Sequence, residues 1–334
     1  MSRRSSPAPR STPCTPAPHD GVASRPLTPN PHGAASTGPS SFLELAPVSV
    51  ISPIVKSTPS ASDQIGPREF AKLADYIFDY AGIRMPASKR TMLEGRLRRR
   101  QRALGFDTLE AYCRHVLTDN NLDQEGIHLI NAVTTNKTDF FREPVHFDFL
   151  RDVALPGLEA TYLRTIRAWS VACSTGPEPY TIAMLLDQFA ATRRGIAYSI
   201  LATDLDTEVL EIARRGIYPA DLAEPVPAAL RRKYLMESRD PARREVRVIP
   251  ELRRAIAFAR LNLMDEVYPV GEPMHLIFCR NVLIYFDKQT QHEVVSKLVS
   301  RLAPGGYLFL GHSESITGHD LPLVPVAHTV FQRS

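Results

Sequence analysis

The sequence lacks paired cysteines, a glycine-rich nucleotide fingerprint and any long apolar run, and each absence excludes a class of protein. The four cysteines, Cys14, Cys113, Cys173 and Cys279, form no CxxC pair and have no metal-ligand spacing. We therefore predict reduced thiols, a cytoplasmic protein and no metal site. No stretch approaches the roughly 20 apolar residues of a membrane-spanning helix, so we expect no membrane insertion. The formal net charge of +4 over 334 residues is too small to indicate a class of partner.

Residues 1–62 are rich in proline and serine and poor in large apolar side chains. They contain 12 of the 28 prolines. Such a segment buries too little apolar surface to offset the entropy lost on ordering, so we predict a disordered tail. Arg3 and Arg4 are not followed by an apolar core, so we do not expect a signal peptide; a transit peptide is the weaker alternative.

Residues 64–145 are predicted to form a helical domain followed by a linker. In 67–80, apolar residues recur at helical spacing behind a helix-start proline. The stretches 88–105, 108–117 and 126–135 have the pattern of further helices. The first of these carries seven basic residues, and its leucines Leu93, Leu97 and Leu104 share one face. We expect the leucines to pack on the body and the arginines to project outward.

From residue 166 the pattern alternates between short apolar strands and amphipathic helices. Strands are predicted at 166–173, 197–204, 275–279 and 307–311, with helices at 180–190, 207–216 and 288–302. This alternation predicts an open, mostly parallel α/β sheet over 146–334. A weaker pattern around 221–260 predicts a small β insertion.

Polar residues follow each of the first three strands. Glu178 lies in the turn and helix start after the first strand, Asp204 ends the second, and Arg280-Asn281 interrupts the apolar run HLIFCRNVLIYF. Burying a guanidinium and an amide without partners would cost several kcal/mol. Ligands of open α/β sheets bind outside the carboxyl ends of the strands, so we expect these side chains to meet a ligand there.

The turn after the first strand has one glycine, Gly176, where a dinucleotide site has GxGxxG. A nucleoside without phosphates therefore fits better than NAD, and Asp204 stands where a ribose is commonly held. S-adenosylmethionine is the candidate, with its cationic amino-acid end paired to Glu178. Taken alone, an acid after a strand is more often a helix cap.

Six segments resemble, in order, the motifs of the CheR family, the S-adenosylmethionine-dependent methyltransferases of bacterial chemoreceptors. They are 136–147 (NKTDFFREPVHF), 169–184, 202–218, 262–265, 278–291 and 302–315, and the resemblance runs from about 64 to 334. It implies a Rossmann-like α/β methyltransferase sheet with an N-terminal helical domain and a small β insertion. The implied reaction methylates glutamate carboxylates of the receptor's cytoplasmic helical bundle and leaves S-adenosylhomocysteine.

The resemblance also implies residue roles. The implied cofactor-binding residues are Asn136, Thr138, Arg142, Glu178, Asp204, Asn262, Leu263, Arg280 and Asn281. Arg142 and Tyr285 are the implied catalytic residues, which hold the substrate carboxylate. Pro177 replaces the first acid of the family's S-T-G-E-E-P-Y motif, and Glu178 retains the second.

The basic stretch at 88–105 has three interpretations: a solvated face, a phosphate-binding face or a face that docks an acidic receptor helix. It lacks the interleaved aromatics of a nucleic-acid module, so no nucleic-acid partner is expected. The resemblance favours receptor docking, by Arg96, Arg98, Arg99 and Arg102. The segment 236–248 has no glycine, unlike the family's receptor-tail loop, so we do not expect such a tether.

The implied chemistry needs no base, because a glutamate carboxylate with a pKa of about 4.3 is ionised at neutral pH. His312 is therefore interpreted as a loop residue, and Glu143 and His146 as capping or packing residues without a role. Two alternatives stay open: the same enzyme in a non-motility pathway, and a cofactor-binding scaffold without turnover. The presence of Arg142, Asp204, Asn281 and Tyr285 argues against the scaffold. We expect a monomer.

Overall fold

The structure is a computed structural model that describes residues 63–118, 121–161, 164–240, 242–316 and 320–334. These residues belong to one unit of the chain, 57–334. The tail predicted to be disordered, 1–62, lies outside the described residues.

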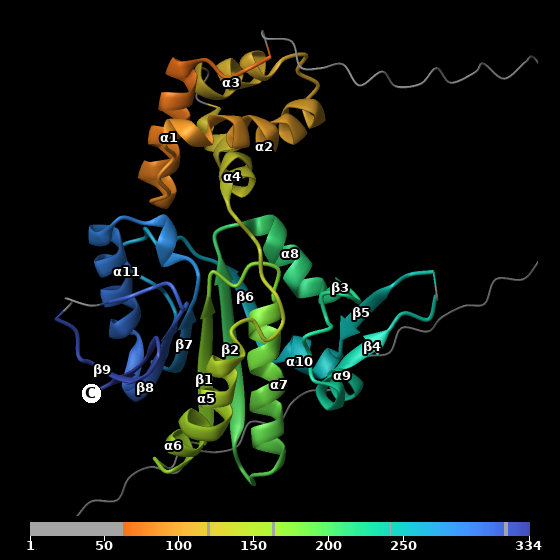
Figure 1. Ribbon diagram of the computed structural model, residues 1–334, viewed down its shortest axis with the longest axis vertical. Coiled ribbons are helices and arrows are strands. Elements are labelled where there is room, and N and C mark those ends of the chain that lie inside the picture. The colour runs from red at the N-terminus through yellow and green to blue at the C-terminus, as the bar shows by residue number, and fades with distance from the viewer. Residues whose placement is uncertain (1–62, 119–120, 162–163, 241, 317–319) are drawn as a thin grey trace, which may run out of the picture. The chain divides into compact units, whose positions relative to one another are not determined.

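The helical domain consists of α1 (Pro67–Ala81), the 3-10 turn η1 (Ala87–Lys89), α2 (Arg90–Ala103), α3 (Leu109–Thr118) and α4 (Leu122–Val133) (Figure 1). Pro67 begins α1, where its missing N–H has no intrahelical partner to lose. Leu73, Ile77, Leu93 and Leu97 are buried in the core between the helices. The four helices predicted from apolar spacing are therefore confirmed.

Two expectations for α2 were wrong. Leu104 is the C-cap residue of α2 and is 40% exposed, so it lies outside the core that buries Leu93 and Leu97. Arg96 does not project outward: its Nη1 donates to the carbonyls of Val133 and Thr134 at 2.6 and 2.7 Å, at the end of α4.

Some of the other basic side chains of α2 also pair within the chain, and others are exposed. Arg98 pairs with Asp63, so it too was wrongly expected to project outward. Arg100 makes two hydrogen bonds to Glu125 of α4. Of the four arginines assigned to receptor docking, only Arg99 and Arg102 are exposed.

The main sheet of the described residues has seven strands in the order β6-β2-β1-β7-β8-β10-β9. The parallel strands are β1 (Thr165–Val171), β2 (Ala197–Asp204), β6 (Ile256–Arg260), β7 (Met274–Cys279) and β8 (Leu302–Leu310). The antiparallel strands β9 (Leu323–Ala327) and β10 (Val330–Arg333) complete one edge. The predicted parallel sheet is confirmed, and β8 begins five residues before the predicted strand at 307.

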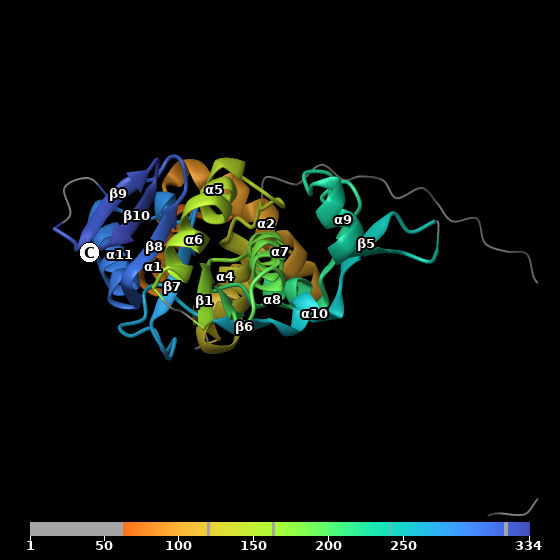
Figure 2. The ribbon, with the colours of Figure 1, turned by 90° about the horizontal axis from the view of Figure 1, so that it is seen from below.

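Apolar side chains cover both faces of this sheet. Phe278 lies in one core with α7 (Pro177–Ala191), α5 (Pro144–Phe149), the π-helical turn η2 (Leu150–Ala154) and α6 (Leu155–Glu159). Figure 2 shows α5, α6 and α7 together on one side of the sheet. Its neighbours Ile277 and Cys279 lie in a second core with α11 (Lys288–Ser300). Successive strand residues point to opposite faces, which explains why β7 is apolar at every position.

A small antiparallel sheet lies outside the main sheet. It consists of β3 (Ile217–Pro219), β4 (Leu235–Glu237) and β5 (Glu245–Val248) in the order β3-β5-β4, with α9 (Ala228–Tyr234) beside it. The insertion expected around 221–260 thus spans 217–248 instead. Residues 256–260 form β6, which pairs with β2 in the main sheet, and the short α10 (Pro250–Arg254) precedes it.

Candidate active site

A pocket opens at the carboxyl ends of β1, β2 and β7, between the sheet, the linker and the helical domain. Its empty volume is about 1210 Å³, open solvent at the mouth included. All ten residues that the sequence assigned to the cofactor or to catalysis line it: Asn136, Thr138, Arg142, Glu178, Asp204, Asn262, Leu263, Arg280, Asn281 and Tyr285. Segments separated by up to about 150 residues in sequence therefore meet at one sheet edge, as the parallel strand order requires.

The turn after β1 depends on a glycine. Gly176 has a φ of 99°, and a Cβ there would lie 2.8 Å from Tyr218 Oη and 2.9 Å from Ala213 Cβ. Pro177 follows as the first residue of α7, a position where proline is favoured. The departure from the family's acid at this position therefore coincides with a well-formed helix start.

Asp204 is the buried acid at the end of β2, and its side chain is only partly satisfied by the protein. Oδ2 accepts the N–H of Ser174 at 2.7 Å, and Oδ1 accepts the N–H of Asp206 at 2.9 Å. Burial raises the pKa of Asp204 to about 6, although these backbone hydrogen bonds lower it. Each carboxylate oxygen has a second lone pair, so the group can still accept hydrogen bonds from ligand hydroxyls.

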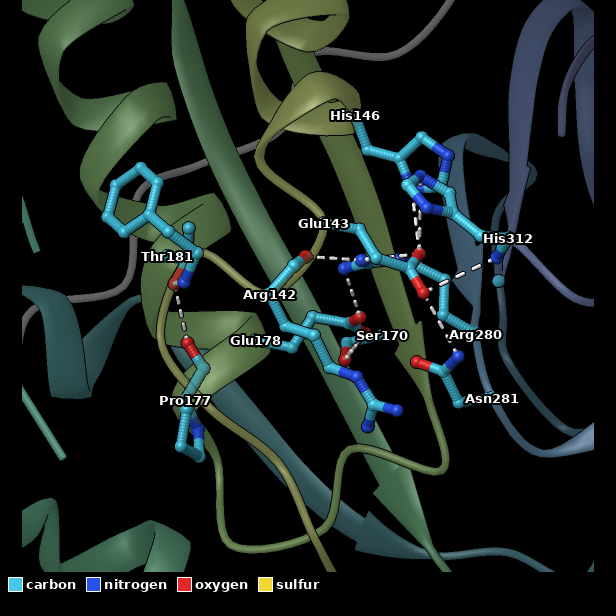
Figure 3. Close-up of polar contacts among 12 residues, drawn as sticks. Arg142, Glu143, His146, Ser170, Pro177, Glu178, Thr181, Arg280, Asn281 and His312 are labelled. Atoms are coloured by element: carbon cyan, nitrogen blue, oxygen red, sulfur yellow. Dashed lines mark hydrogen bonds and ion pairs between the residues drawn. The ribbon is translucent and has the colours of Figure 1, made fainter. Parts of the chain in front are cut away.

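Arg280 meets carboxylates of the protein itself. Its side chain is 2% exposed, with Nη1 3.0 Å from Glu178 Oε2 and Nη2 2.9 Å from Glu143 Oε2 (Figure 3). Nη2 also donates to the carbonyl of Arg142. The Nε atom is buried and has no partner among the described residues. The polar break in HLIFCRNVLIYF is therefore satisfied mainly from within the chain.

The two carboxylates that flank Arg280 differ in their surroundings. Burial raises the pKa of Glu178, although Arg280 and the hydroxyl of Ser170, which donates at 2.7 Å, lower it. Burial also opposes ionisation of Glu143, but hydrogen bonds from Arg280 and Asn281 hold its pKa below the usual value. Both oxygens of Glu178 thus have a protein partner, and each retains a further lone pair, so its pairing with the cationic end of the ligand stays a prediction.

The linker is fixed to the sheet by a second acid, which the sequence analysis did not identify. Asp206 caps α8 (Thr207–Arg215) with Oδ1, and its Oδ2 accepts Asn136 Nδ2 at 2.7 Å and Thr134 Oγ1 at 2.9 Å. The Ser174 hydroxyl donates to the carbonyl of Asn136 at 2.8 Å. Asn136 therefore lines the pocket while its amide holds the linker, and the helix-capping spacing of Asp206 was the available sequence signal.

Three more of the predicted residues that line the pocket are Asn262, Arg142 and Tyr285. Asn262 donates from Nδ2 to the carbonyl of Tyr80 at 2.6 Å, which joins the sheet to α1. Arg142 donates from Nη1 to the carbonyl of Lys137 at 3.0 Å. Tyr285 lies half-buried in the 3-10 turn η3 (Leu283–Tyr285), where the apolar run continues beyond Asn281.

Two family models match most of the described chain. "CheR methyltransferase, SAM binding domain" matches residues 136–331, and "CheR methyltransferase, all-alpha domain" matches 68–134. Both domains are those of S-adenosylmethionine-dependent methyltransferases with a helical N-terminal domain. The chain belongs to the CheR methyltransferase family.

Proteins with the name chemotaxis protein methyltransferase are similar over most of the chain. The one from Escherichia coli is 43% identical over 266 residues, which are 79% of this chain and 90% of that protein. The one from Borreliella burgdorferi is 40% identical over 256 residues, 75% of this chain and 89% of that protein. Among solved structures, the glycopeptide N-methyltransferase MtfA complexed with sinefungin is a distant match, with 48% of each chain covered, a TM-score of 0.28 and 15% identity.

S-adenosylmethionine is the cofactor of this chain, and the residues of the pocket fit it. The Asp204 carboxylate retains acceptor lone pairs suited to ribose hydroxyls, and Leu263, Val282 and Phe286 line the pocket with apolar surface suited to an adenine ring. The unpartnered Nε of Arg280 is a buried donor suited to the carboxylate of the amino-acid end. Within the described residues, every helix is too short or too polar to cross a membrane.

Proposed function

We propose that the protein transfers the methyl group of S-adenosylmethionine to glutamate side chains of bacterial chemoreceptors. The products are glutamate methyl esters and S-adenosylhomocysteine. The observation that supports this most is the meeting of all ten assigned residues in one strand-end pocket beside the helical domain. The names of the similar proteins support a chemotaxis substrate.

The proposed reaction depends on alignment more than on proton transfer. When bound, the cofactor supplies a methyl group on a positively charged sulfur. A substrate carboxylate oxygen forms the new bond to the methyl carbon, the carbon–sulfur bond breaks, and its electron pair remains on sulfur, so no proton moves. Alignment of the reacting atoms in such a site contributes roughly 7–11 kcal/mol in favourable cases.

The residues around the pocket have distinct proposed tasks. Asp204 binds the ribose, and the linker covers the pocket and excludes water. Among the described residues, the Arg142 side chain has one hydrogen bond, to the carbonyl of Lys137, so its other donors are proposed to hold the substrate carboxylate. The Tyr285 hydroxyl is proposed to donate to the same carboxylate. Asn136 and Asn262 are proposed mainly to shape the site, because protein atoms already accept hydrogen bonds from their side chains. Arg280 is proposed to donate from its unpartnered Nε to the carboxylate of the cofactor.

The proposed docking surface for the receptor is smaller than the sequence suggested. It consists of Arg99 and Arg102, since Arg96 and Arg98 are engaged within the chain. Exposed cations on α2 complement the carboxylates that a methyl-accepting helix presents, and such pairs mainly raise the association rate. The receptor's cytoplasmic helical bundle is the proposed partner, which places the reaction in the cytoplasm.

The test is methyl transfer from radiolabelled S-adenosylmethionine to a purified cytoplasmic fragment of a chemoreceptor. We expect label on the receptor fragment, released by mild base as methanol, because carboxyl methyl esters are base-labile. The variant Asp204→Ala serves as a control with reduced cofactor binding. Label that is stable to base, or no label although the cofactor binds, would refute the proposed substrate.

A further inference from the structure

Glu143 is an acid of the site to which the sequence assigned no role, and its carboxylate joins three segments of the chain. Oε2 lies 2.9 Å from Arg280 Nη2, and Oε1 accepts Asn281 Nδ2 at 3.1 Å. Oε1 also accepts the backbone N–H of His312 at 3.3 Å (Figure 3). The donors come from the end of β7 and from the loop after β8, whereas Glu143 belongs to the linker.

Glu143 has an unfavourable backbone conformation, which is consistent with a structural requirement for its side chain. Its φ of 58° and ψ of 67° lie in the left-handed region, which non-glycine residues rarely adopt. The residue precedes α5 at the capping position, yet its side chain makes no capping hydrogen bond. The carboxylate therefore serves the end of β7 and not the helix that it precedes.

Glu143 and two neighbouring histidines are residue types that bind metal ions, but the positive charge of Arg280 opposes the binding of a cation there. His146 Nδ1 lies 3.5 Å and His312 Nε2 3.8 Å from Glu143 Oε2, and the three groups lie within 4.8 Å of one another. Arg280 Nη2 is 2.9 Å from the same oxygen, so a divalent cation bound there would be repelled at short range. The grouping is better explained as a carboxylate surrounded by hydrogen-bond donors.

We propose that Glu143 is a positioning residue of the cofactor site, which orients the Asn281 side chain in the pocket and fixes the linker on the end of β7. Asn281 has a φ of 59°, so its backbone also needs support in this conformation. Glu143 supports Asn281 by accepting a hydrogen bond from its Nδ2, and Glu314 Oε2 accepts the backbone N–H of Asn281 at 3.0 Å. The inference rests on the proposed assignment of Asn281 to the cofactor.

The first variant is Glu143→Gln, which keeps the shape of the side chain and removes its charge. Glutamine offers one acceptor oxygen where glutamate offers two, so Arg280 or Asn281 loses its partner. Arg280 stays paired with Glu178, so its buried charge keeps one acidic partner. We expect the affinity for S-adenosylhomocysteine, measured by calorimetry, to fall about tenfold or more. The KM for S-adenosylmethionine should rise while the KM for the receptor fragment stays the same.

The matched control is Glu125→Gln in the helical domain. Glu125 is 7% exposed and accepts two hydrogen bonds from Arg100, at 2.6 and 2.9 Å. This substitution removes a comparable acid from an arginine far from the pocket, so the melting temperature should fall with no change in cofactor affinity. A second variant, Glu143→Asp, keeps the charge beside Arg280 but withdraws the carboxylate by one methylene. We expect the affinity of Glu143→Asp for S-adenosylhomocysteine to lie within about twofold of that of Glu143→Gln.

A double-mutant cycle with Asn281→Ala decides the inference. If Glu143 acts through Asn281, the double variant should bind S-adenosylhomocysteine as weakly as the weaker single variant, within about twofold. Additive losses, or an unchanged affinity in both Glu143 variants, would overturn the inference and leave the assignment of Asn281 standing. An unchanged affinity in Asn281→Ala alone would overturn that assignment and the inference with it.

Discussion

The basic face of α2 and the strand-end pocket both contain arginines that were predicted from the sequence to be functional. The two groups differ in burial and in the partners of their side chains. On α2, Arg96 and Arg98 are held by the end of α4 and by Asp63, and Arg99 and Arg102 remain exposed. In the pocket, Arg280 is almost completely buried between two acids that lie 137 and 102 residues away in sequence. Arg280 therefore belongs to the interior of the site, whereas the exposed Arg99 and Arg102 indicate at most a surface for a partner.

The largest effect expected from this comparison concerns stability. The substitution Arg280→Met leaves Glu143 and Glu178 buried without their cation, which should lower the free energy of unfolding by about 3–5 kcal/mol. The matched control is Arg254→Met, because Arg254 pairs with Glu251 at 3.2 Å on the surface, with 73% of its side chain exposed. Chemical denaturation should show a large loss for the first variant and almost none for the second. Equal losses would mean that the buried cluster is no more important to the fold than a surface pair.

The next effect concerns the cofactor. The substitution Asp204→Ala removes the charged acceptor at the end of β2 and should weaken binding of S-adenosylhomocysteine by about 1.5–3 kcal/mol. Calorimetry measures the affinity, and a thermal melt of the same sample controls for misfolding, because the N–H groups of Ser174 and Asp206 lose their acceptor. Full affinity in a folded variant would refute the ribose assignment.

The third and smaller effect is a dependence on pH. Lowering the pH should weaken the binding of S-adenosylhomocysteine, whereas the contribution of Asp204 to the stability of the free protein should increase. Since burial raises the pKa of Asp204 to about 6, lowering the pH from 7 to 5 protonates the carboxylate. Binding of ribose hydroxyls by the ionised form should then weaken by roughly tenfold. The contribution of Asp204 to the stability of the free protein runs the other way: it is present below the unfolded pKa and is lost as the pH rises through 6.

The control for this profile is Asp204→Asn, which has no charge to titrate. Its affinity for S-adenosylhomocysteine should be lower than that of the parent protein and nearly constant between pH 5 and 7. A profile as steep as that of the parent protein would show that another group causes the pH dependence.

The smallest expected effect is on the docking surface. Reversal of Arg99 and Arg102 to Glu should lower kcat/KM for a receptor fragment several-fold at low salt, and the loss should shrink as salt screens the charges. The same charge change in Arg164→Glu/Arg194→Glu, exposed residues at the amino ends of β1 and β2, is the matched control. An equal loss in both double variants would mean that net charge, and not α2, governs the encounter.

Much of the fold followed from local patterns in the sequence. Apolar spacing predicted α1 to α4, and the polar break at Arg280-Asn281 located the end of β7 to the residue. The six motifs also predicted which residues gather in the pocket. The prediction for Leu104 was wrong because apolar periodicity shows which face of a helix is apolar and not how far along the helix the core extends.

What could not be predicted depends on contacts between distant residues. The sequence gives no sign that Glu143 reaches Arg280, or that Asp206 holds Asn136, because each pair is formed only when the linker lies on the sheet. The same holds for Arg96, whose acceptors are backbone carbonyls that any residue would supply. Side-chain type indicates what a group can bind, and tertiary structure decides which partner it has.

The cofactor is proposed to occupy the strand-end pocket under the linker. Amide hydrogen exchange of the full chain, with and without saturating S-adenosylhomocysteine, is the most direct test. We predict slower exchange on binding at 134–142, 172–178, 204–206, 261–264 and 280–286, and unchanged exchange in the small sheet at 217–248. Protection confined to other segments, or absent at the strand ends although the ligand is bound, would contradict it.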